Sequence, residues 1–506
     1  MSRSKNTIRN IKWGFFNKVI VLLFPFLTRT LLIKVLGSEY VGLGSLYTSI
    51  LQVLNLAELG IGSAITFSLY KPVANNDIKT IRALMNLYKK VYRAIGIIIL
   101  IIGMLIFPFL GNFIHGSVPS DINIYFLYLI YLFNTALTYF LFAYKTIVLT
   151  VNQRNDILSN INSIVYLLQY IYQIIILLIF KNYYLFIIIT PITTIINNLV
   201  GAYISTKLYP ECYCEGKISS EEEKDIKKRV YGLVLQKFCA TTRNSLDSIF
   251  ISSFLGLSIV ALYNNYYMIM ESLISVVGII TLSMSASIGN SIAIETKEKN
   301  YYDMNKINFI YMWLAGFCTI CLACLYQPFM KLWLGNDYMF DFTTVILFCA
   351  YFYSLKMGDI LSTYSQGAGL WWEGKYRALV ETILNVILNY VLGKNFGVNG
   401  IILGTLISLL LVNFGYGTTI IFKYYFKNQK VFEYFKNHAI YLTITIVNLL
   451  ITLFICSKIG NTGIINFIIK IIICIVIPNI LYLIIYRKNK YFAEGKKLIF
   501  NLLKRK

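Results

Sequence analysis

Charged side chains are scarce in this sequence. Only 14% of the 506 residues are charged and 57% are hydrophobic, whereas a soluble globular domain is about 25% charged and about 45–50% apolar. Apolar runs of about 20 residues recur from end to end, which is the length a helix needs to cross a bilayer core about 30 Å thick. The composition excludes a soluble globular protein. The long runs exclude a membrane β-barrel, whose strands are shorter and alternate in polarity.

Histidine is nearly absent, and the cysteines are scattered. The chain has two His and nine Cys. Cys318, Cys321 and Cys324 share one side of an apolar span, and without nearby imidazole or charged partners we interpret them as core packing. Cys212 and Cys214 lie in an expected cytoplasmic loop, where a disulfide is disfavoured. We expect no metal, no catalytic residues and no cofactor, apart from a coupling ion (proton or sodium).

The hydropathy pattern predicts an all-α polytopic membrane protein with about fourteen transmembrane helices. A first span this long, without a convincing cleavage site, is expected to be retained rather than removed as a signal peptide. The expected spans are 13–34, 42–69, 89–110, 122–150, 158–180, 183–206, 231–255, 259–290, 307–327, 342–366, 377–393, 399–422, 438–457 and 464–486.

Basic residues are distributed unevenly between the two sides of these spans. With the N-terminus placed in the cytoplasm, 34 of the 46 Lys and Arg fall in inside segments, and four fall in outside loops. Cytoplasmic loops carry such an excess in membrane proteins. The bias predicts that both termini are cytoplasmic. The same bias explains the net charge of +23, because the excess basic residues orient the chain in the membrane and contact anionic lipid. Nucleic-acid binding is not needed to explain it.

An internal repeat divides the chain. Residues LIKVLGSEYVGLGSLY near the first loop are similar to ISSFLGLSIVALYNNY near the seventh, with Gly37 aligned to Gly256 and Gly42 to Ala261 at an offset of 219. Six spans per half insert both halves the same way, which predicts a parallel pseudo-two-fold repeat with any site between the halves. The expected domains are an N-lobe (1–206), a cytoplasmic linker (207–230), a C-lobe (231–424) and helices 13 and 14 with a basic tail (425–506).

Ionisable residues within the spans are the strongest functional signal. Each costs at least about 2.5 kcal/mol at the midplane when it faces lipid, so we expect them to face a protein interior or a wet cavity. The cations outnumber the acids, which predicts a positive cavity suited to an anionic substrate. The cations are Lys18, Arg29, Lys145, Lys237, Arg243, Lys356 and Lys470, and the acids are Glu58, Asp247, Glu271 and Asp359.

Helical spacing assigns these residues to faces. Lys18 and Arg29 share a face of the first span. One stripe is expected in the second span (Gln52, Asn55, Glu58, Gly62, Thr66), and another in the fourth (Asn134, Thr138, Lys145). Two pairs are spaced for contact within one helix, Arg243 with Asp247 and Lys356 with Asp359, either as helix locks or as a cavity lining. Lys470, in the appended helix pair, is expected to snorkel.

Glu58 lies at the centre of the predicted stripe in the second span. A diphosphate would repel a lone carboxylate, so Glu58 is not expected to contact phosphate directly. Two roles stay open. Glu58 either pairs with a cation on another span, with Arg29 as the nearest guess, or serves as a proton or sodium site with a pKa set by burial and nearby cations.

The stretch LGSEYVGLGSLYTSILQVLNLAELGIGSAITFSLYKP resembles the N-terminal signature of Wzx-type oligosaccharide flippases, in the superfamily that contains MATE exporters and the lipid II flippase MurJ. NQRND at 152–156, LWLGNDY at 332–338 and GxxxVALYNNY at 256–266 also fit. The resemblance implies a two-lobed fourteen-helix fold, alternating access, and transport of undecaprenyl-diphosphate-linked oligosaccharide to the outer leaflet of a bacterial cytoplasmic membrane. It places Arg29, Lys145 and Arg243 on lumen helices.

The buried charges suit such a substrate. Arg offers bidentate contacts to phosphate, and amide and aromatic groups such as Asn264, Asn265, Tyr266 and Tyr267 could contact sugars. Expected partners are the lipid-linked oligosaccharide, membrane lipids, and polysaccharide polymerase and assembly proteins, without nucleic acid. The alternatives are lipid II as substrate, a MATE-like exporter of cations, which an anionic cavity would favour, and a membrane-embedded polymerase, for which the outer loops are too short.

Overall fold

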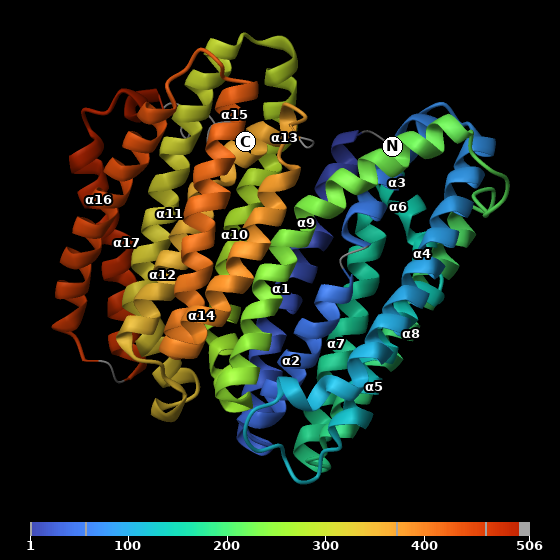
Figure 1. Cartoon of the computed structure of the whole chain (residues 1–506), viewed down its shortest axis with the longest axis horizontal. Coiled ribbons are helices and arrows are strands. Elements are labelled where there is room, and N and C mark those ends of the chain that lie inside the picture. Colours follow the sequence, from blue (N-terminus) through green and yellow to red (C-terminus); the bar gives the residue numbers. More distant parts are fainter. Residues whose placement is uncertain (1–2, 56–57, 371–372, 461–462, 495–506) are drawn as a thin grey trace. The chain divides into compact units, whose positions relative to one another are not determined.

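A computed structural model describes residues 3–55, 58–370, 373–460 and 463–494, and the described part is helical without a strand (Figure 1). The chain forms two compact units, Met1–Ala261 and Leu262–Lys506. The prediction of an all-α fold is confirmed. The domain boundaries expected at 206/207 and 230/231 stay a prediction. The seventh span packs along the second and therefore belongs to the first compact unit.

The first unit holds nine α-helices. They are α1 (Arg3–Val35), α2 (Ser38–Leu54), α3 (Glu58–Ala74), α4 (Ile78–Ile106), α5 (Ile124–Phe140), α6 (Ile147–Val151), α7 (Asn155–Ile179), α8 (Tyr183–Leu208) and α9 (Ser220–Leu255). Helix α1 packs along α7, α5 packs on α4 and α8, and α9 packs on α2 and α3. Short 3₁₀ segments follow α4 (Phe107–Phe113) and precede α6 (Ala143–Thr146).

The second unit contains the remaining helices, and the unit boundary falls in the second turn of its first helix. They are α10 (Leu257–Ile294), α11 (Lys297–Trp333), α12 (Phe342–Met357), α13 (Asp359–Gly367), α14 (Lys375–Ser408), α15 (Gly417–Tyr424), α16 (Val431–Ser457) and α17 (Ile464–Tyr486), with a π-helical segment at Leu409–Tyr416. Figure 1 shows the red helices α16 and α17 beside α11, and both pack on it.

Polar side chains at the loop boundaries start several of these helices. The carboxylate of Asp77 accepts from the Thr80 amide at the start of α4, and Asn123 accepts from two amides at the start of α5. Asn182, Thr296 and Asp341 cap α8, α11 and α12 in the same way. Each cap satisfies amides that have no partner in the first turn, a contribution of about 1 kcal/mol where the cap is lost to Ala.

Nine helices of the described part are long and apolar enough to cross a membrane, or ten when the bent pair α5 and Ala143–Val151 counts as one span. One of the nine runs for 50 residues from Lys375 to Tyr424, about twice the length that a bilayer core needs. It is interrupted at Gly397, where φ is 58° and ψ is −137°. This break separates the predicted spans 377–393 and 399–422.

The described helices account for every predicted span. Helix α2 with α3, α5 with α6, and α12 with α13 each make one interrupted pass, and α14 with α15 makes two passes that meet at Gly397. The remaining long helices each make one. Helices therefore lie at all fourteen predicted spans. Nine or ten of the described helices are long and apolar enough to cross a membrane, so the chain is a multi-pass membrane protein and the number fourteen stays a prediction.

Candidate substrate-binding residues

Two glycine turns, one in each sequence repeat, share a backbone geometry. Gly37 separates α1 from α2 with φ 120°, and Gly256 separates α9 from α10 with φ 93°. The Gly37 amide donates to the Leu32 carbonyl (3.3 Å), and the Gly256 amide donates to the Ile251 carbonyl (3.2 Å). Both bonds span five residues and close the preceding helix, with glycine in the positive-φ position that favours it. The repeat predicted from sequence is therefore also a repeat of local structure.

The two turns lie against each other within the first unit. The Ser258 hydroxyl donates to the Glu39 carboxylate at 2.8 Å, and these residues are 219 apart. A Cβ on Gly42 would lie 2.1 Å from the Leu257 carbonyl oxygen, so only glycine fits this close backbone approach. The residues that align in sequence thus meet in space.

Arg29 reaches this turn junction from α1. Its guanidinium donates to the Ala261 carbonyl at 3.4 Å, and it interacts electrostatically with the Tyr183 hydroxyl of α8. Arg29 is half-buried and lies six residues before the end of α1, about 9 Å along the axis. The structure therefore places a planar cation at the point where the two repeat turns meet.

Tyrosines line the first unit beside Arg29. The Tyr131 and Tyr183 hydroxyls are hydrogen-bonded at 3.1 Å, and a Cβ on Gly44 would lie 2.7 Å from each of them. Tyr40 packs edge-on against Tyr183 and donates to the Asp121 carboxylate at 2.5 Å. The junction therefore combines one cation with several hydroxyl donors and aromatic faces.

The polar stripe predicted for the second span lies only partly within the described residues. Helix α2 ends at Leu54 and α3 begins at Glu58, and the residues 56–57 between them lie outside the described part, so the single face stays a prediction. Gln52 accepts from the Ser245 hydroxyl of α9 at 3.2 Å, whereas Asn55 accepts from the Tyr139 hydroxyl of α5 at 3.1 Å. The two side chains therefore serve different neighbours. The Glu58 side chain lies outside the described residues, so both roles expected for it stay predictions.

The stripe predicted for the fourth span is interrupted. Helix α5 ends at Phe140, and Phe142 adopts a left-handed conformation with φ 62°, so the following segment is bent by 50°. Asn134 accepts from the Thr194 hydroxyl of α8 at 2.9 Å. Lys145, beyond the bend, donates to the Thr206 hydroxyl at 3.1 Å. Lys145 therefore lies at the end of α8 that leads into the 207–230 loop.

Helix α9 carries two buried charged residues, Arg243 and Asp247. Arg243 is 7% exposed and Asp247 is fully buried, and each interacts with a neighbouring group. The expectation that these charges avoid lipid is met at both positions. Lys18 is half-buried on α1. The side chain of Lys237, also on α9, lies outside the described residues.

In the second unit, the predicted pair Lys356–Asp359 is confirmed. The Lys356 ammonium is 2.6 Å from an Asp359 carboxylate oxygen, and the Tyr311 hydroxyl of α11 donates to the same oxygen at 2.5 Å. Lys356 is 4% exposed. The pair bridges the break between α12 and α13 at Gly358 and ties that break to α11.

The sequence analysis did not identify two buried acids. Glu381 on α14 is 2% exposed and accepts from the Asn413 amide at 3.1 Å. Asp156 is buried at the start of α7 and pairs with Arg154 at 3.2 Å. Glu381 lies within the predicted span 377–393, so its position alone could have identified it. Asp156 was assigned to a loop, and only the fold shows its burial.

Glu271 is exposed on α10, and whether it faces a wet cavity stays a prediction. Other predicted positions need correction. Tyr266 and Asn265 are fully buried, and the Tyr266 hydroxyl donates to Gln327 at 2.9 Å, so these two side chains belong to the core rather than to a sugar-binding surface. Lys470 is 3% exposed and does not snorkel, because its helix is packed against α11 on that side.

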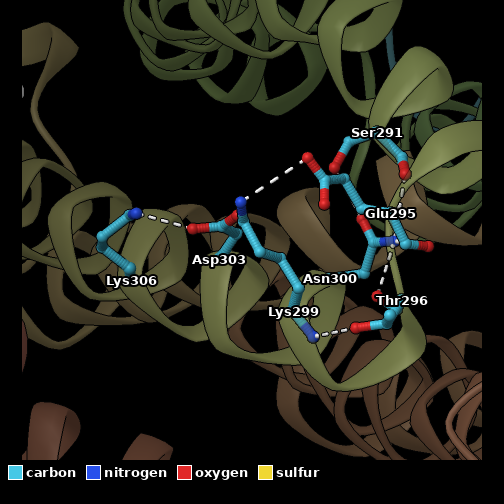
Figure 2. Close-up of polar contacts among 7 residues, drawn as sticks. All are labelled: Ser291, Glu295, Thr296, Lys299, Asn300, Asp303 and Lys306. Atoms are coloured by element: carbon cyan, nitrogen blue, oxygen red, sulfur yellow. Dashed lines mark hydrogen bonds and ion pairs between the residues drawn. The ribbon is translucent and has the colours of Figure 1, made fainter.

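Several hydrogen bonds join the turn between α10 and α11 (Figure 2). The amide of Asn300, a fully buried residue, donates to the Ser291 carbonyl at 3.1 Å, and the Ser291 hydroxyl donates back to Asn300 at 2.8 Å. Lys306 pairs with Asp303 on α11 at 2.6 Å (Figure 2). Lys306 also lies 3.8 Å from the Glu494 carboxylate, after α17. The bonds between Ser291 and Asn300 fasten α10 to α11, and the Lys306–Glu494 pair fastens the segment after α17 to α11.

The region that contains the two glycine turns also matches a known protein family. The family profile described as "polysaccharide biosynthesis protein" matches residues 7–288, which include the two glycine turns and Arg29. The chain belongs to this family. No curated protein matches the sequence significantly.

Solved structures agree with this membership. The chain is similar to the lipid II flippase MurJ in an inward closed conformation, at 17% identity and a TM-score of 0.68, with 95% of this chain and 99% of that one covered. It is also similar to an inward-facing multidrug-resistance MATE transporter of the MOP superfamily, at 14% identity and a TM-score of 0.60, with 79% and 94% covered.

A third structure is informative about this fold. It is a MOP superfamily transporter from Pyrococcus furiosus whose description reports a binding pocket of reverse polarity, at 14% identity and a TM-score of 0.55, with 82% and 95% covered. At these identities the likeness concerns the fold alone. Family membership and fold together make the chain a multi-pass membrane protein of the polysaccharide biosynthesis family with a MOP-type fold.

Proposed function

We propose that this protein flips an undecaprenyl-diphosphate-linked oligosaccharide from the inner to the outer leaflet of a bacterial cytoplasmic membrane by alternating access, with both termini in the cytoplasm. Membership of the polysaccharide biosynthesis family supports the class of substrate. The MOP-type fold supports the mode of transport. Membrane lipids, and polysaccharide polymerase and assembly proteins, are the expected partners.

The position of Arg29 carries this proposal. A guanidinium inside a membrane span is costly unless it meets water or an anion. Arg29 is half-buried beside Tyr183 and donates to the Ala261 carbonyl at 3.4 Å. Two parallel N–H groups suit a diphosphate. The hydroxyls of Tyr131 and Tyr183 would contribute further donors next to it.

The remaining cations contribute differently. Arg243 and Lys356 are buried, and Lys356 is neutralised by Asp359, so we assign both to the supporting framework of the pathway. Lys145 is bonded to Thr206 near the 207–230 loop, where it is placed to attract the headgroup before entry. Glu271, exposed halfway along α10, is the carboxylate that we assign to proton or sodium coupling, because a charge there has to face water.

Reconstituted protein tests the proposal directly. A lipid-linked oligosaccharide with a fluorophore on the sugar is incorporated into both leaflets of proteoliposomes, and an impermeant reductant quenches the outer leaflet. Without flipping, the reductant quenches about half of the fluorescence. Active protein moves inner-leaflet lipid to the outer leaflet, so nearly all of the fluorescence is quenched. We expect Arg29→Ala to slow flipping at least about tenfold and Arg29→Lys to retain part of it, because Lys lacks the planar pair of donors.

A matched control and a second substrate separate the alternatives. Lys458→Ala removes a cation that lies over the Phe454 ring at the end of α16 and should leave flipping unchanged. Wild-type flipping by a well-folded Arg29→Ala variant would contradict the assigned role. Labelled lipid II, run in parallel, tests the substrate, since faster flipping of lipid II than of the oligosaccharide would replace the proposed substrate with that of MurJ.

A further inference from the structure

The second unit contains a cluster of thiols that the transport function does not use. The sulfur atoms of Cys324 (α11), Cys456 (α16) and Cys474 (α17) all lie within 4.8 Å of one another, and all three residues are buried. The Cys321 thiol, one turn before Cys324, donates to the Cys474 carbonyl at 3.9 Å. Three helices that are far apart in sequence thus deliver four cysteines to one place.

Two prolines shape this place. Pro328 lies inside α11 and Pro478 lies inside α17, four residues after Cys324 and Cys474 respectively. Proline has no N–H, so neither cysteine carbonyl receives the usual helical hydrogen bond. The freed Cys474 carbonyl accepts from Cys321 instead, which locks the two helices together at the depth of the thiols.

The spacing suits a metal ion bound by sulfur. With a Zn–S distance of about 2.3 Å, sulfur atoms around one zinc are separated by about 3.8–4.0 Å. The three thiols therefore need to close by less than about 1 Å, within the reach of χ1 adjustments. Cys321 stands beside this triangle as a fourth donor. Thiolate ligands select thiophilic ions over the oxygen-preferring Mg²⁺ and Ca²⁺.

A buried cation balances the charge. Lys470 is 3% exposed, lies one turn before Cys474 on α17, and interacts electrostatically with Cys324, Cys456 and Cys474. Binding of Zn²⁺ by three thiols releases three protons and leaves a complex of charge −1, which the Lys470 ammonium neutralises. In a low-dielectric interior, an ion site is stable only when its charges are paired in this way.

We propose that Cys324, Cys456 and Cys474 bind a thiophilic metal ion as thiolates, with Zn²⁺ as the charge-balanced occupant, Cys321 beside it and Lys470 as the counter-ion. The bound metal joins α16 and α17 to α11. It therefore acts as a staple for the C-terminal helix pair and is independent of the substrate pathway.

Metal analysis of the full-length protein tests this site. Protein purified under reducing conditions in detergent, with zinc in the growth medium, should contain about one zinc per chain. Cobalt added to the chelator-stripped protein should give a thiolate-to-cobalt charge-transfer band, and added Cu(I) should displace it. The double variant Cys456→Ser/Cys474→Ser should lose both the zinc and the band, at least about tenfold relative to the parent.

Matched controls keep the result interpretable. Cys349→Ser changes another buried cysteine, on α12, and should retain the metal. Lys470→Met should weaken cobalt binding while leaving all thiols present, which a merely structural lysine would not do. Zinc retained by the double variant, or a parent chain that binds neither cobalt nor Cu(I) with all thiols reduced, would overturn the proposal. A mass 2 Da lower before reduction would identify a disulfide and overturn it as well.

Discussion

The fourth pass of each half breaks at an equivalent place, but the two breaks are stabilised differently. In the first half, α5 ends at Phe140 and the chain turns through Phe142 at φ 62°. In the second, α12 ends at Met357 and the chain turns at Gly358. The Lys356–Asp359 ion pair spans the second break, whereas the Lys145 ammonium, after the first break, donates to the neutral hydroxyl of Thr206. The repeat has kept the backbone break and changed its chemistry.

The same contrast appears at helix starts and at the glycine turns. Asp77 caps α4 and Thr296 caps α11 at positions 219 residues apart, so one repeat has a titratable cap and the other does not. At the turn junction, Gly42 in the first repeat corresponds to Ala261 in the second. Gly42 lies against the Leu257 backbone, whereas the Ala261 carbonyl accepts from the Arg29 guanidinium. Equivalent positions therefore share a conformation without sharing a role.

The largest effect is expected at the charged break. Asp359→Asn leaves the buried Lys356 ammonium without its carboxylate and should lower the free energy of unfolding by about 3 kcal/mol. Lys145→Met in the other half should cost less than about 1 kcal/mol, because one partly exposed hydrogen bond is lost. Unfolding by denaturing detergent in mixed micelles measures both.

A second variant separates charge from packing at this break. Lys356→Met combined with Asp359→Asn removes both charges, so it should recover most of the stability lost by Asp359→Asn alone. If Asp359→Asn proves no more harmful than Lys145→Met, the two breaks are equivalent after all.

An intermediate effect is expected at the turn junction. A methyl group on Gly42 would lie 2.1 Å from the Leu257 carbonyl oxygen, which is backbone and has to shift. Gly42→Ala should therefore destabilise the protein by about 1–3 kcal/mol, measured by the thermal unfolding midpoint in detergent. Gly278→Ala is the matched control, because nothing lies within 4 Å of its added Cβ. Equal midpoints for the two variants would show that the turns are not in close contact.

The smallest effect concerns the two helix caps. The hydrogen bonds from Thr80 lower the pKa of the Asp77 carboxyl below its usual value of 3.8. The resulting stabilisation is present above pH 3.8 and is lost as the pH falls through the lowered pKa of the folded protein. Asp77→Thr, which copies the cap of the second repeat, should reduce the loss of stability on acidification from pH 5 to below 3.8. Unfolding midpoints measured across that range test it, and an unchanged pH profile would contradict the assignment.

Sequence reasoning succeeded where the signal was local. Apolar runs gave the spans, the i,i+3 spacing gave the Lys356–Asp359 pair, and the aligned glycines gave turns of matching φ. It failed where a helix was assumed to be continuous. The bend of 50° after Phe140 interrupts the stripe predicted for the fourth span, and no strong breaker such as proline marks that site.

What the sequence by itself determined is the membrane-spanning helical fold, its repeat and the presence of charge within it. Hydrophobic run length, turn glycines and charge spacing are properties of short sequence segments. Lipid then imposes helical structure on the apolar segments, because their backbone groups have to be hydrogen-bonded within the segment. Only the tertiary structure decided which side chains meet. Arg29 finds the Ala261 carbonyl, and Cys324 finds Cys456 and Cys474, because packing sets the rotation of each helix about its axis. That rotation depends on all neighbouring helices at once, and no single helix encodes it.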